Sequence, residues 1–416
     1  MTDLKGKRLL ILGGNTLSCD IVNAAKRLGV YTIVTDWYDT DRSPAKLIAD
    51  EYWNEEVFRP DLLAQLVKDK GIDGVITGFS DSYLFPYQEL CTLAGLPCYA
   101  TKEQFEWTTD KSSFKERCRR YNVPVVPEYD INSFDKTVIN NNHKVIIKPV
   151  DNSGSRGICI CDDPNEFEEK LTYSLGFSEK KQVVIERYMD CDDVSFEYKI
   201  QDGEVKLTSI CDRFIYKTAN EGSITSSLIY PSKYTDAYMA DVDRRVKHMF
   251  EAEGLRNGVL FMQAFAENGQ FYFYEMGYRL SGGRHYIFTK NQNGDSAVEE
   301  LINFAISGKM SEKRIAEAAT PRFKDVCSQL SIICKTDKIA SIEGWSAIAE
   351  MPQVIDAMPM LKEGQVVGKQ GTTASMFARL HIVTNTPKEL DTVKDYVFST
   401  LKVKNEKGEN LVIRCL

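Results

Sequence analysis

The chain has 416 residues, 43% hydrophobic and 27% charged, which is typical of a folded globular protein of about three domains. Its net charge of −8 argues against a nucleic-acid-binding surface, and no stretch approaches the roughly 18 consecutive apolar residues that a membrane span needs. Eleven cysteines without a C-x-x-C pair, four dispersed histidines and no signal-peptide pattern predict a cytoplasmic protein with reduced thiols and no zinc site.

The first hundred residues alternate short apolar runs with amphipathic segments. This pattern predicts strands at 8–15, 30–37 and 73–79 and helices at 18–28, 61–71 and 82–94. Such alternation indicates parallel strands joined by right-handed crossovers, so we expect an α/β, Rossmann-like domain. The turn Gly13-Gly14-Asn15 lacks the third glycine of the dinucleotide fingerprint. Asp36 ends the second strand, where such folds often bind a hydroxyl. For the Gly13-Gly14-Asn15 turn itself, a purely structural role fits the sequence at least as well as nucleotide binding.

A second unit begins near Trp107 with a capping-type start, a basic helix and a proline-marked exit within 108–129. Strands are predicted at 145–150, 158–162 and 182–189, a helix at 165–175, and a hairpin over 194–210 that turns at 202–203. A helix near 236–253 precedes a strand-rich segment over 258–286. The last hundred residues contain a strand and a helix at 388–401, which we interpret as a small α/β cap.

Two lysines and a glycine-rich loop suggest phosphate binding, although the sequence contains no Walker A motif. Lysine ammonium groups suit phosphate oxygens; Lys111, however, could equally be a solvated helix residue. Lys148 ends a buried strand directly before the loop, whose small residues Ser153, Gly154, Ser155 and Gly157 allow backbone N–H groups to face an anion. The alternative is an ordinary β-turn between antiparallel strands. Lys148 favours phosphate binding.

Gln263 and Glu275 lie twelve residues apart across a predicted hairpin. Their side-chain oxygens are of the kind that Mg²⁺ prefers. A plain two-residue turn at Asn268-Gly269 would place the two side chains on opposite faces of the hairpin. A three-residue loop or a bulge would place them side by side. We expect the longer loop or a bulge, and a plain turn without one would count against this metal site.

The order of these elements over residues 8–310 resembles the ATP-grasp superfamily, with motifs similar to those of the carbamoyl-phosphate synthase large subunit, biotin carboxylase and the L-amino-acid ligases. The resemblance implies an α/β protein, α+β in its nucleotide-binding part. It implies a Rossmann-like preATP-grasp domain (1–106), an ATP-grasp domain (107–308) and a C-terminal α/β cap (309–416). The ATP-grasp domain would comprise a small subdomain with the glycine-rich flap (107–182) and a central subdomain with the hinge and metal site (183–308).

The resemblance also implies roles for single residues. Lys111, Lys148 and the flap would bind ATP phosphates, and the hinge Glu186-Arg187-Tyr188-Met189 would hold adenine. Asp193 would bind ribose, with Asp190 or Asp192 as alternatives. Gln263 and Glu275 would hold Mg²⁺ or Mn²⁺. Gly277 replaces the asparagine of the family pattern, which puts a second metal in doubt unless water, Glu267 or substrate fills the gap.

For the chemistry itself, the resemblance implies that Arg279 holds the acyl-phosphate. Arg284 would anchor a carboxylate or be an ordinary surface arginine, and His285 would be a hydrogen-bonded helper rather than a base. Arg213 and Lys217 would line the acceptor pocket or lie in a solvated loop.

We therefore predict an ATP-dependent carboxylate–amine ligase that forms an acyl-phosphate and releases ADP and phosphate, with amino acids among its candidate substrates. The alternatives are a bicarbonate-activating enzyme similar to biotin carboxylase or carbamoyl-phosphate synthase, and a non-catalytic ATP-binding protein that has kept the fold. The expected partners are a small carboxylate and an amine, with neither nucleic acid nor membrane, and a homodimer is compatible with this prediction.

Overall fold

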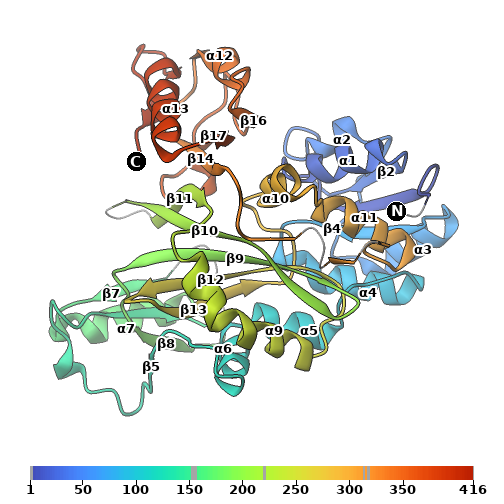
Figure 1. The fold of residues 1–416 in the computed structure, drawn as a ribbon. Helices are drawn as coiled ribbons and strands as arrows, with labels where there is room; N and C mark the ends of the chain where they lie inside the picture. The colour runs from blue at the N-terminus through green and yellow to red at the C-terminus, as the bar shows by residue number, and fades with distance from the viewer. Residues whose placement is uncertain (1–2, 151–156, 219–221, 313, 316–318, 416) are drawn as a thin grey trace.

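The computed structural model describes residues 3–150, 157–218, 222–312, 314–315 and 319–415 (Figure 1). It opens with a parallel sheet in the order β3-β2-β1-β4, formed by β1 (Arg8–Leu12), β2 (Tyr31–Thr35), β3 (Glu51–Trp53) and β4 (Gly74–Thr77). The helices α1 (Ser18–Arg27), α2 (Ala45–Ile48), α3 (Pro60–Asp69) and α4 (Leu84–Ala94) alternate with these strands. The predicted α/β domain is confirmed.

The helices α5 (Lys102–Thr109) and α6 (Lys111–Arg120) lead into a second, antiparallel sheet in the order β5-β8-β6-β7. Its strands are β5 (Glu128–Tyr129), β6 (Val145–Pro149), β7 (Cys159–Cys161) and β8 (Val183–Arg187), and α7 (Phe167–Gly176) packs on them. Asp110 caps α6 by accepting a hydrogen bond from the Ser113 N–H at 2.8 Å, as the capping pattern predicts.

A nine-stranded antiparallel sheet forms the centre of the molecule, and its main path runs β13-β12-β9-β10-β11-β14-β17-β16. The strands of its first half are β9 (Asp192–Gln201), β10 (Glu204–Thr218), β11 (Gly222–Tyr230), β12 (Gly258–Glu267) and β13 (Gln270–Gly277). The helices of this part are α8 (Thr235–Ala240), α9 (Val242–Ala252), α10 (Tyr286–Asn293) and α11 (Ala297–Ser307).

The C-terminal region continues this same sheet. It contributes β14 (Val326–Cys334), β16 (Val354–Pro359), β17 (Met376–Thr384) and β19 (Val412–Ile413), and β14 pairs directly with β11. The short strands β15 (Ser341–Glu343) and β18 (Lys402–Lys404) pair separately, and α12 (Trp345–Ala349) and α13 (Pro387–Thr400) complete the region. Figure 1 shows this region, coloured orange to red, above the green central strands. The predicted cap therefore shares backbone hydrogen bonds with the central subdomain.

One hydrophobic core joins the N-terminal sheet to the central subdomain, since Ile11 and Ile76 belong to the same buried cluster as Leu260 and Leu301. The contact between β4 and α11 is close: a Cβ atom on Gly74 would lie 2.5 Å from the Ala305 carbonyl oxygen. None of the described helices is long and apolar enough to cross a bilayer.

Candidate active site

The β12–β13 hairpin carries the two predicted metal ligands. Its turn has two residues, Asn268 and Gly269, both with positive φ (52° and 78°). The register shifts between Gln263, which pairs with Glu275, and Ala264, which pairs with Phe273. Tyr274 is therefore an extra residue, and the predicted bulge is present. The bulge places Gln263 and Glu275 directly opposite each other.

Gln263 belongs to a hydrogen-bonded cluster with Asp193, Arg213 and Tyr274. Arg213 Nη1 donates to Gln263 Oε1 at 2.9 Å and to Asp193 Oδ1 at 2.9 Å. The Tyr274 hydroxyl lies 3.0 Å from each of the same two oxygen atoms, which compete for its one proton. Burial raises the pKa of Asp193 despite the opposing effect of Arg213. Arg213 lies within β10, so its alternative reading as part of a solvated loop is wrong.

The Glu275 carboxylate makes no hydrogen bond or ion pair with any described residue and is half-buried. An unpaired carboxylate in this position fits a hard cation. The Gln263 oxygen accepts a hydrogen bond from the Arg213 guanidinium and lies 3.0 Å from the Tyr274 hydroxyl, so it faces hydrogen-bond donors rather than an open ligand position in this arrangement. No group of three or more His, Cys, Asp or Glu side chains suited to a metal occurs in the described ranges. The fit is therefore to one carboxylate ligand.

Lys148 is buried at the end of β6, as predicted, and binds a carboxylate. Its Nζ lies 2.7 Å from Glu186 Oε2, and the other oxygen of Glu186 accepts a hydrogen bond from Lys115. Lys115 also lies 2.7 Å from Glu128 Oε1. Burial lowers the pKa of Lys148; Glu186 opposes this, and the charges of Lys115 and Lys111 add to it. Lys111, the first residue of α6, is therefore near Lys148.

The predicted hinge connects the small sheet to the central sheet. Arg187 at the end of β8 forms an ion pair with Glu267 of β12, and the Lys217 ammonium on β10 donates to the Tyr188 hydroxyl at 3.3 Å. Met189 is buried. These contacts bring the hinge alongside β10 and β12. Adenine binding by these residues and ribose binding by Asp193 stay predictions.

Of the predicted flap, Ser153, Gly154 and Ser155 lie outside the described residues. Gly157 has φ +75°, and a Cβ atom there would lie 2.5 Å from the Phe177 Cβ. Only glycine fits this position without displacing its neighbour.

Arg279 follows β13 and binds the N-terminal domain. Its Nε and Nη2 donate to the two carboxylate oxygens of Asp81 at 2.7 Å and 2.6 Å, and its guanidinium lies 5.1 Å from the centre of the Phe261 ring. This bidentate geometry holds the guanidinium plane in one orientation.

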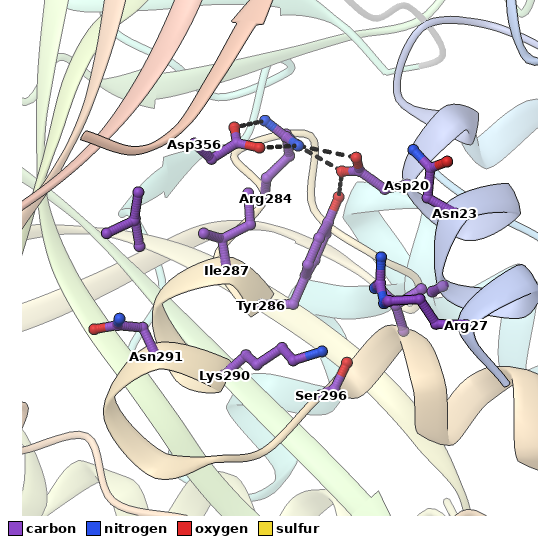
Figure 2. A pocket seen from close by; sticks show the side chains of 13 residues that line it. Asp20, Asn23, Arg27, Arg284, Tyr286, Ile287, Lys290, Asn291, Ser296 and Asp356 are labelled. Atoms are coloured by element: carbon purple, nitrogen blue, oxygen red, sulfur yellow. Dashed lines mark hydrogen bonds and ion pairs between the residues drawn. The ribbon is translucent and has the colours of Figure 1, made fainter. Parts of the chain in front are cut away.

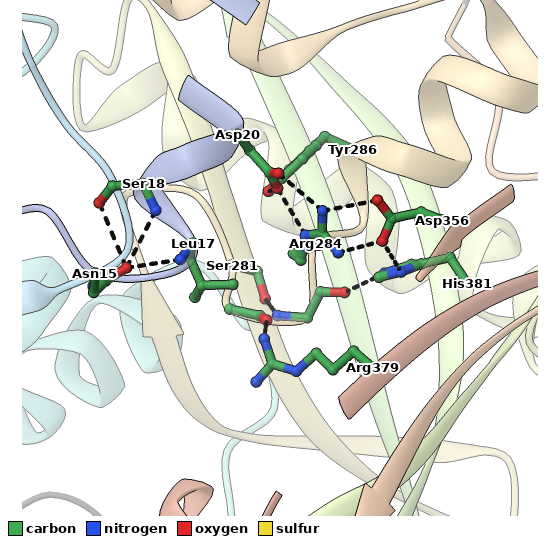
Figure 3. A network of polar contacts seen from close by, with 12 residues as sticks. Asn15, Leu17, Ser18, Asp20, Ser281, Arg284, Tyr286, Asp356, Arg379 and His381 are labelled. Carbon is green, nitrogen blue, oxygen red and sulfur yellow. Dashed lines mark hydrogen bonds and ion pairs between the residues drawn. The ribbon is translucent and has the colours of Figure 1, made fainter. Parts of the chain in front are cut away.

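Arg284 is 2% exposed, so the reading as a surface arginine is wrong. Its Nε donates to Asp20 Oδ2 at 2.7 Å, and its Nη2 donates to Asp356 Oδ1 at 3.1 Å (Figure 3). Asp20 belongs to α1 and Asp356 to β16, so one guanidinium joins the N-terminal, central and C-terminal parts of the chain. The predicted carboxylate anchor thus binds two carboxylates of the protein itself; its binding of a substrate carboxylate stays a prediction.

The loop 281–283 lies beside two residues that the sequence analysis did not select. Arg379 on β17 donates from Nη1 to the Gly282 carbonyl, and His381 Nε2 lies 3.5 Å from the Gly283 carbonyl (Figure 3). Arg379 is 8% exposed, and its Nε has no hydrogen-bond partner. Burial, and then the charge of Arg284, lower its pKa to about 10. The one sequence signal for Arg379 was a charged residue within a largely apolar strand.

His285 is buried and hydrogen-bonded through Nδ1 to the Tyr230 hydroxyl. Burial, followed by the charges of Arg213 and His381, lowers its pKa to about 3, so the imidazole is neutral at pH 7. This agrees with a hydrogen-bonded role. Asp36, in contrast, accepts hydrogen bonds from the Gly14 N–H at 2.8 Å and the Ser43 hydroxyl at 3.0 Å, which makes Gly13–Asn15 a structural turn.

A cavity of about 430 Å³ borders the Arg284 ion pairs and lies between α1, the α10–α11 segment and β16. Figure 2 shows the side chains that line it, with Arg284 and its two carboxylates on one wall and Lys290 and Ser296 on another. The predicted residues Lys148, Glu186, Gln263 and Glu275 do not line this cavity.

Residues 141–286 match the ATP-grasp domain family. The formate-dependent phosphoribosylglycinamide formyltransferase of Mycobacteroides abscessus is 23% identical over 291 residues, 65% of this chain and 70% of that protein. Among solved structures, the L-amino acid ligase from Bacillus licheniformis has a TM-score of 0.79 at 17% identity, covering 97% of this chain and 99% of that one. The biotin carboxylase domain of the Hydrogenobacter thermophilus 2-oxoglutarate carboxylase, a dimer in complex with MgADP, ADP and bicarbonate, has a TM-score of 0.74 at 18% identity, covering 98% and 91%.

Residues 141–286 are therefore an ATP-grasp domain, and the chain as a whole has the fold of these solved structures. The resemblance drawn from the sequence is confirmed. The prediction of an ATP-dependent ligase is confirmed at the level of this domain family.

Proposed function

We propose that the protein joins a small carboxylic acid to an amine, using ATP to activate the acid as an acyl-phosphate. The observation that carries this proposal is the arrangement of charge: the buried Lys148 at the end of β6, an unpaired Glu275 carboxylate, and Arg279 held by Asp81 in a fixed orientation. These are the groups that in-line phosphoryl transfer requires for positioning and charge stabilisation.

In the first step, an oxygen of the substrate carboxylate attacks the γ-phosphorus of ATP, and the bond from that phosphorus to the ADP oxygen breaks. Lys148 and Lys111 would hold phosphate oxygens, while Arg279 would bind the acyl-phosphate. Glu275 would hold Mg²⁺, which when bound neutralises phosphate charge. In the second step the amine nitrogen attacks the acyl carbon, and phosphate leaves with the carboxylate oxygen. The amine loses one proton to solvent.

The acceptor is proposed to carry an anionic group. Arg379 is buried beside Gly282 and has an unpartnered Nε, so an anion there would satisfy a donor that no described residue satisfies. His285 is neutral at pH 7 and so offers no positive charge to an anion at this loop.

The names of the relatives guide the choice of acids. One uses formate, one joins L-amino acids, and one was solved with bicarbonate. The panel therefore begins with formate, the amino acids and bicarbonate, each paired with amino acids and with phosphate-bearing amines. A homodimer stays a prediction.

The decisive experiment measures ADP release and the path of ¹⁸O. An acid labelled with ¹⁸O in its carboxylate should transfer one labelled oxygen to phosphate, and release should require both acid and amine. Lys148→Met should abolish release, whereas Lys136→Met, an exposed lysine of the same subdomain that pairs with Glu168, should retain it. Unlabelled phosphate, or ADP release that is independent of the acid, would refute the acyl-phosphate route.

A further inference from the structure

Lys115 and Lys148 share a single buried carboxylate. Lys115 Nζ donates to one oxygen of Glu186, and Lys148 Nζ lies 2.7 Å from the other. Lys115 is 1% exposed and Glu186 is 2% exposed, so bulk water solvates neither charge. The Glu186 carboxylate and the Lys115 ammonium therefore stabilise each other's charge.

The cluster carries more positive than negative charge. Its second carboxylate, Glu128, lies 2.7 Å from Lys115 and also pairs with Arg119, whose side chain is 49% exposed. Three cations thus face two carboxylates. Burial raises the pKa of Glu186, but Lys148 and Lys115 outweigh burial and hold it below its ordinary value. Glu186 is therefore ionised and needs a cation at all times.

The two lysines differ in what surrounds them. Lys115 projects from the middle of α6 and is held by two carboxylates, whereas Lys148 lies at the end of β6 and has Glu186 as its one carboxylate partner among the described residues. Of the two lysines, only Lys148 can move away from Glu186 without breaking a second ion pair. When Lys148 has moved away, Lys115 still neutralises Glu186.

We infer that Lys115 is a positioning residue: it holds the charge of Glu186, so that the Lys148 ammonium can move from this carboxylate to a phosphate oxygen when ATP binds. The inference rests on the proposed binding of ATP phosphate by Lys148, but not on the identity of the acid or amine. No covalent bond changes in this step. The excess positive charge of the cluster is the charge that the phosphate neutralises.

The test measures the dissociation constant of MgATP by calorimetry, with no acid or amine present, so that it is independent of the ligase reaction. Lys115→Met should weaken ATP binding by about 10-fold or more, because Glu186 then retains Lys148. Arg120→Met, an exposed change on the same helix, should leave binding within about 2-fold of the wild type.

A rescue experiment separates positioning from a structural effect. In a Glu186→Gln background the carboxylate no longer needs a cation, so Lys115→Met should change ATP affinity by less than about 2-fold. This comparison also serves if the single variant does not fold. Wild-type affinity in Lys115→Met, or a further loss of about 10-fold from Lys115→Met in the Glu186→Gln background, would overturn the inference.

Discussion

The buried carboxyl group of Glu197 provides a prediction whose magnitude follows from its raised pKa. Glu197 lies in β9, is 5% exposed, and its carboxyl group makes no hydrogen bond with any described residue. Burial, followed by the charge of Asp295, raises its pKa from 4.5 to about 8. In the folded protein the group therefore keeps its proton at pH 7, whereas in the unfolded chain it has lost it. Stability falls as pH rises from 4.5 to 8 and is then constant.

The loss of stability at a given pH follows from the difference between that pH and the pKa of 4.5 in the unfolded chain. The 2.5 pH units between 4.5 and 7 correspond to about 3 kcal/mol, at about 1.36 kcal/mol per unit. Glu197→Gln has almost the same shape but no charge to lose. We therefore expect it to raise the free energy of unfolding by up to about 3 kcal/mol at pH 7 and by only about 1 kcal/mol at pH 5.5.

Urea unfolding at pH 5.5, 7 and 8.5, followed by circular dichroism, measures this difference. The exposed Glu179→Gln serves as the control, and its curves should follow those of the wild type at each pH. If Glu197→Gln and the wild type lose stability in parallel between pH 5.5 and 8.5, Glu197 does not carry the shifted proton and the reasoning fails.

Two further variants test the packing and the charge around the site. Gly157→Ala, which would place a Cβ atom 2.5 Å from the Phe177 Cβ, should lower stability by about 1–3 kcal/mol and weaken ATP binding, whereas Gly176→Ala, with nothing within 4 Å, should not. Equal melting temperatures for the two variants would contradict this packing. Asp20→Asn leaves the buried Arg284 with one carboxylate and should cost about 3 kcal/mol in thermal unfolding, and a loss below about 1 kcal/mol would show that this ion pair is dispensable.

The sequence was most informative where local pattern decides the structure. The β12–β13 hairpin is an example: Asn268-Gly269 is a strong signal for a two-residue turn, and the separation of Gln263 and Glu275 then requires a bulge if they are to face each other. The burial of Lys148 at the end of β6 was likewise readable, because it follows an unbroken β-branched run.

Contacts between distant parts of the chain could not be predicted in this way. Arg284 binds Asp20, 264 positions away, and Asp356, 72 positions away, and no periodicity encodes either partner. The pairing of β14 with β11 that merges the C-terminal region into the central sheet is of the same kind. Lys115 was missed for a different reason: spaced four residues from Lys111 on a basic helix, it is typical of a solvated face until β5 and β8 are placed against it.

The segment 279–284 connects these observations. An arginine at each end binds a carboxylate of the N-terminal domain in bidentate geometry, Arg279 with Asp81 and Arg284 with Asp20. Between them, the Gly282 carbonyl accepts a hydrogen bond from Arg379 of the C-terminal region. A short glycine-containing loop has little conformational preference of its own. Its shape is therefore set by the docking of the N-terminal domain and the C-terminal region. An acid or amine that binds against this loop would be positioned by these contacts.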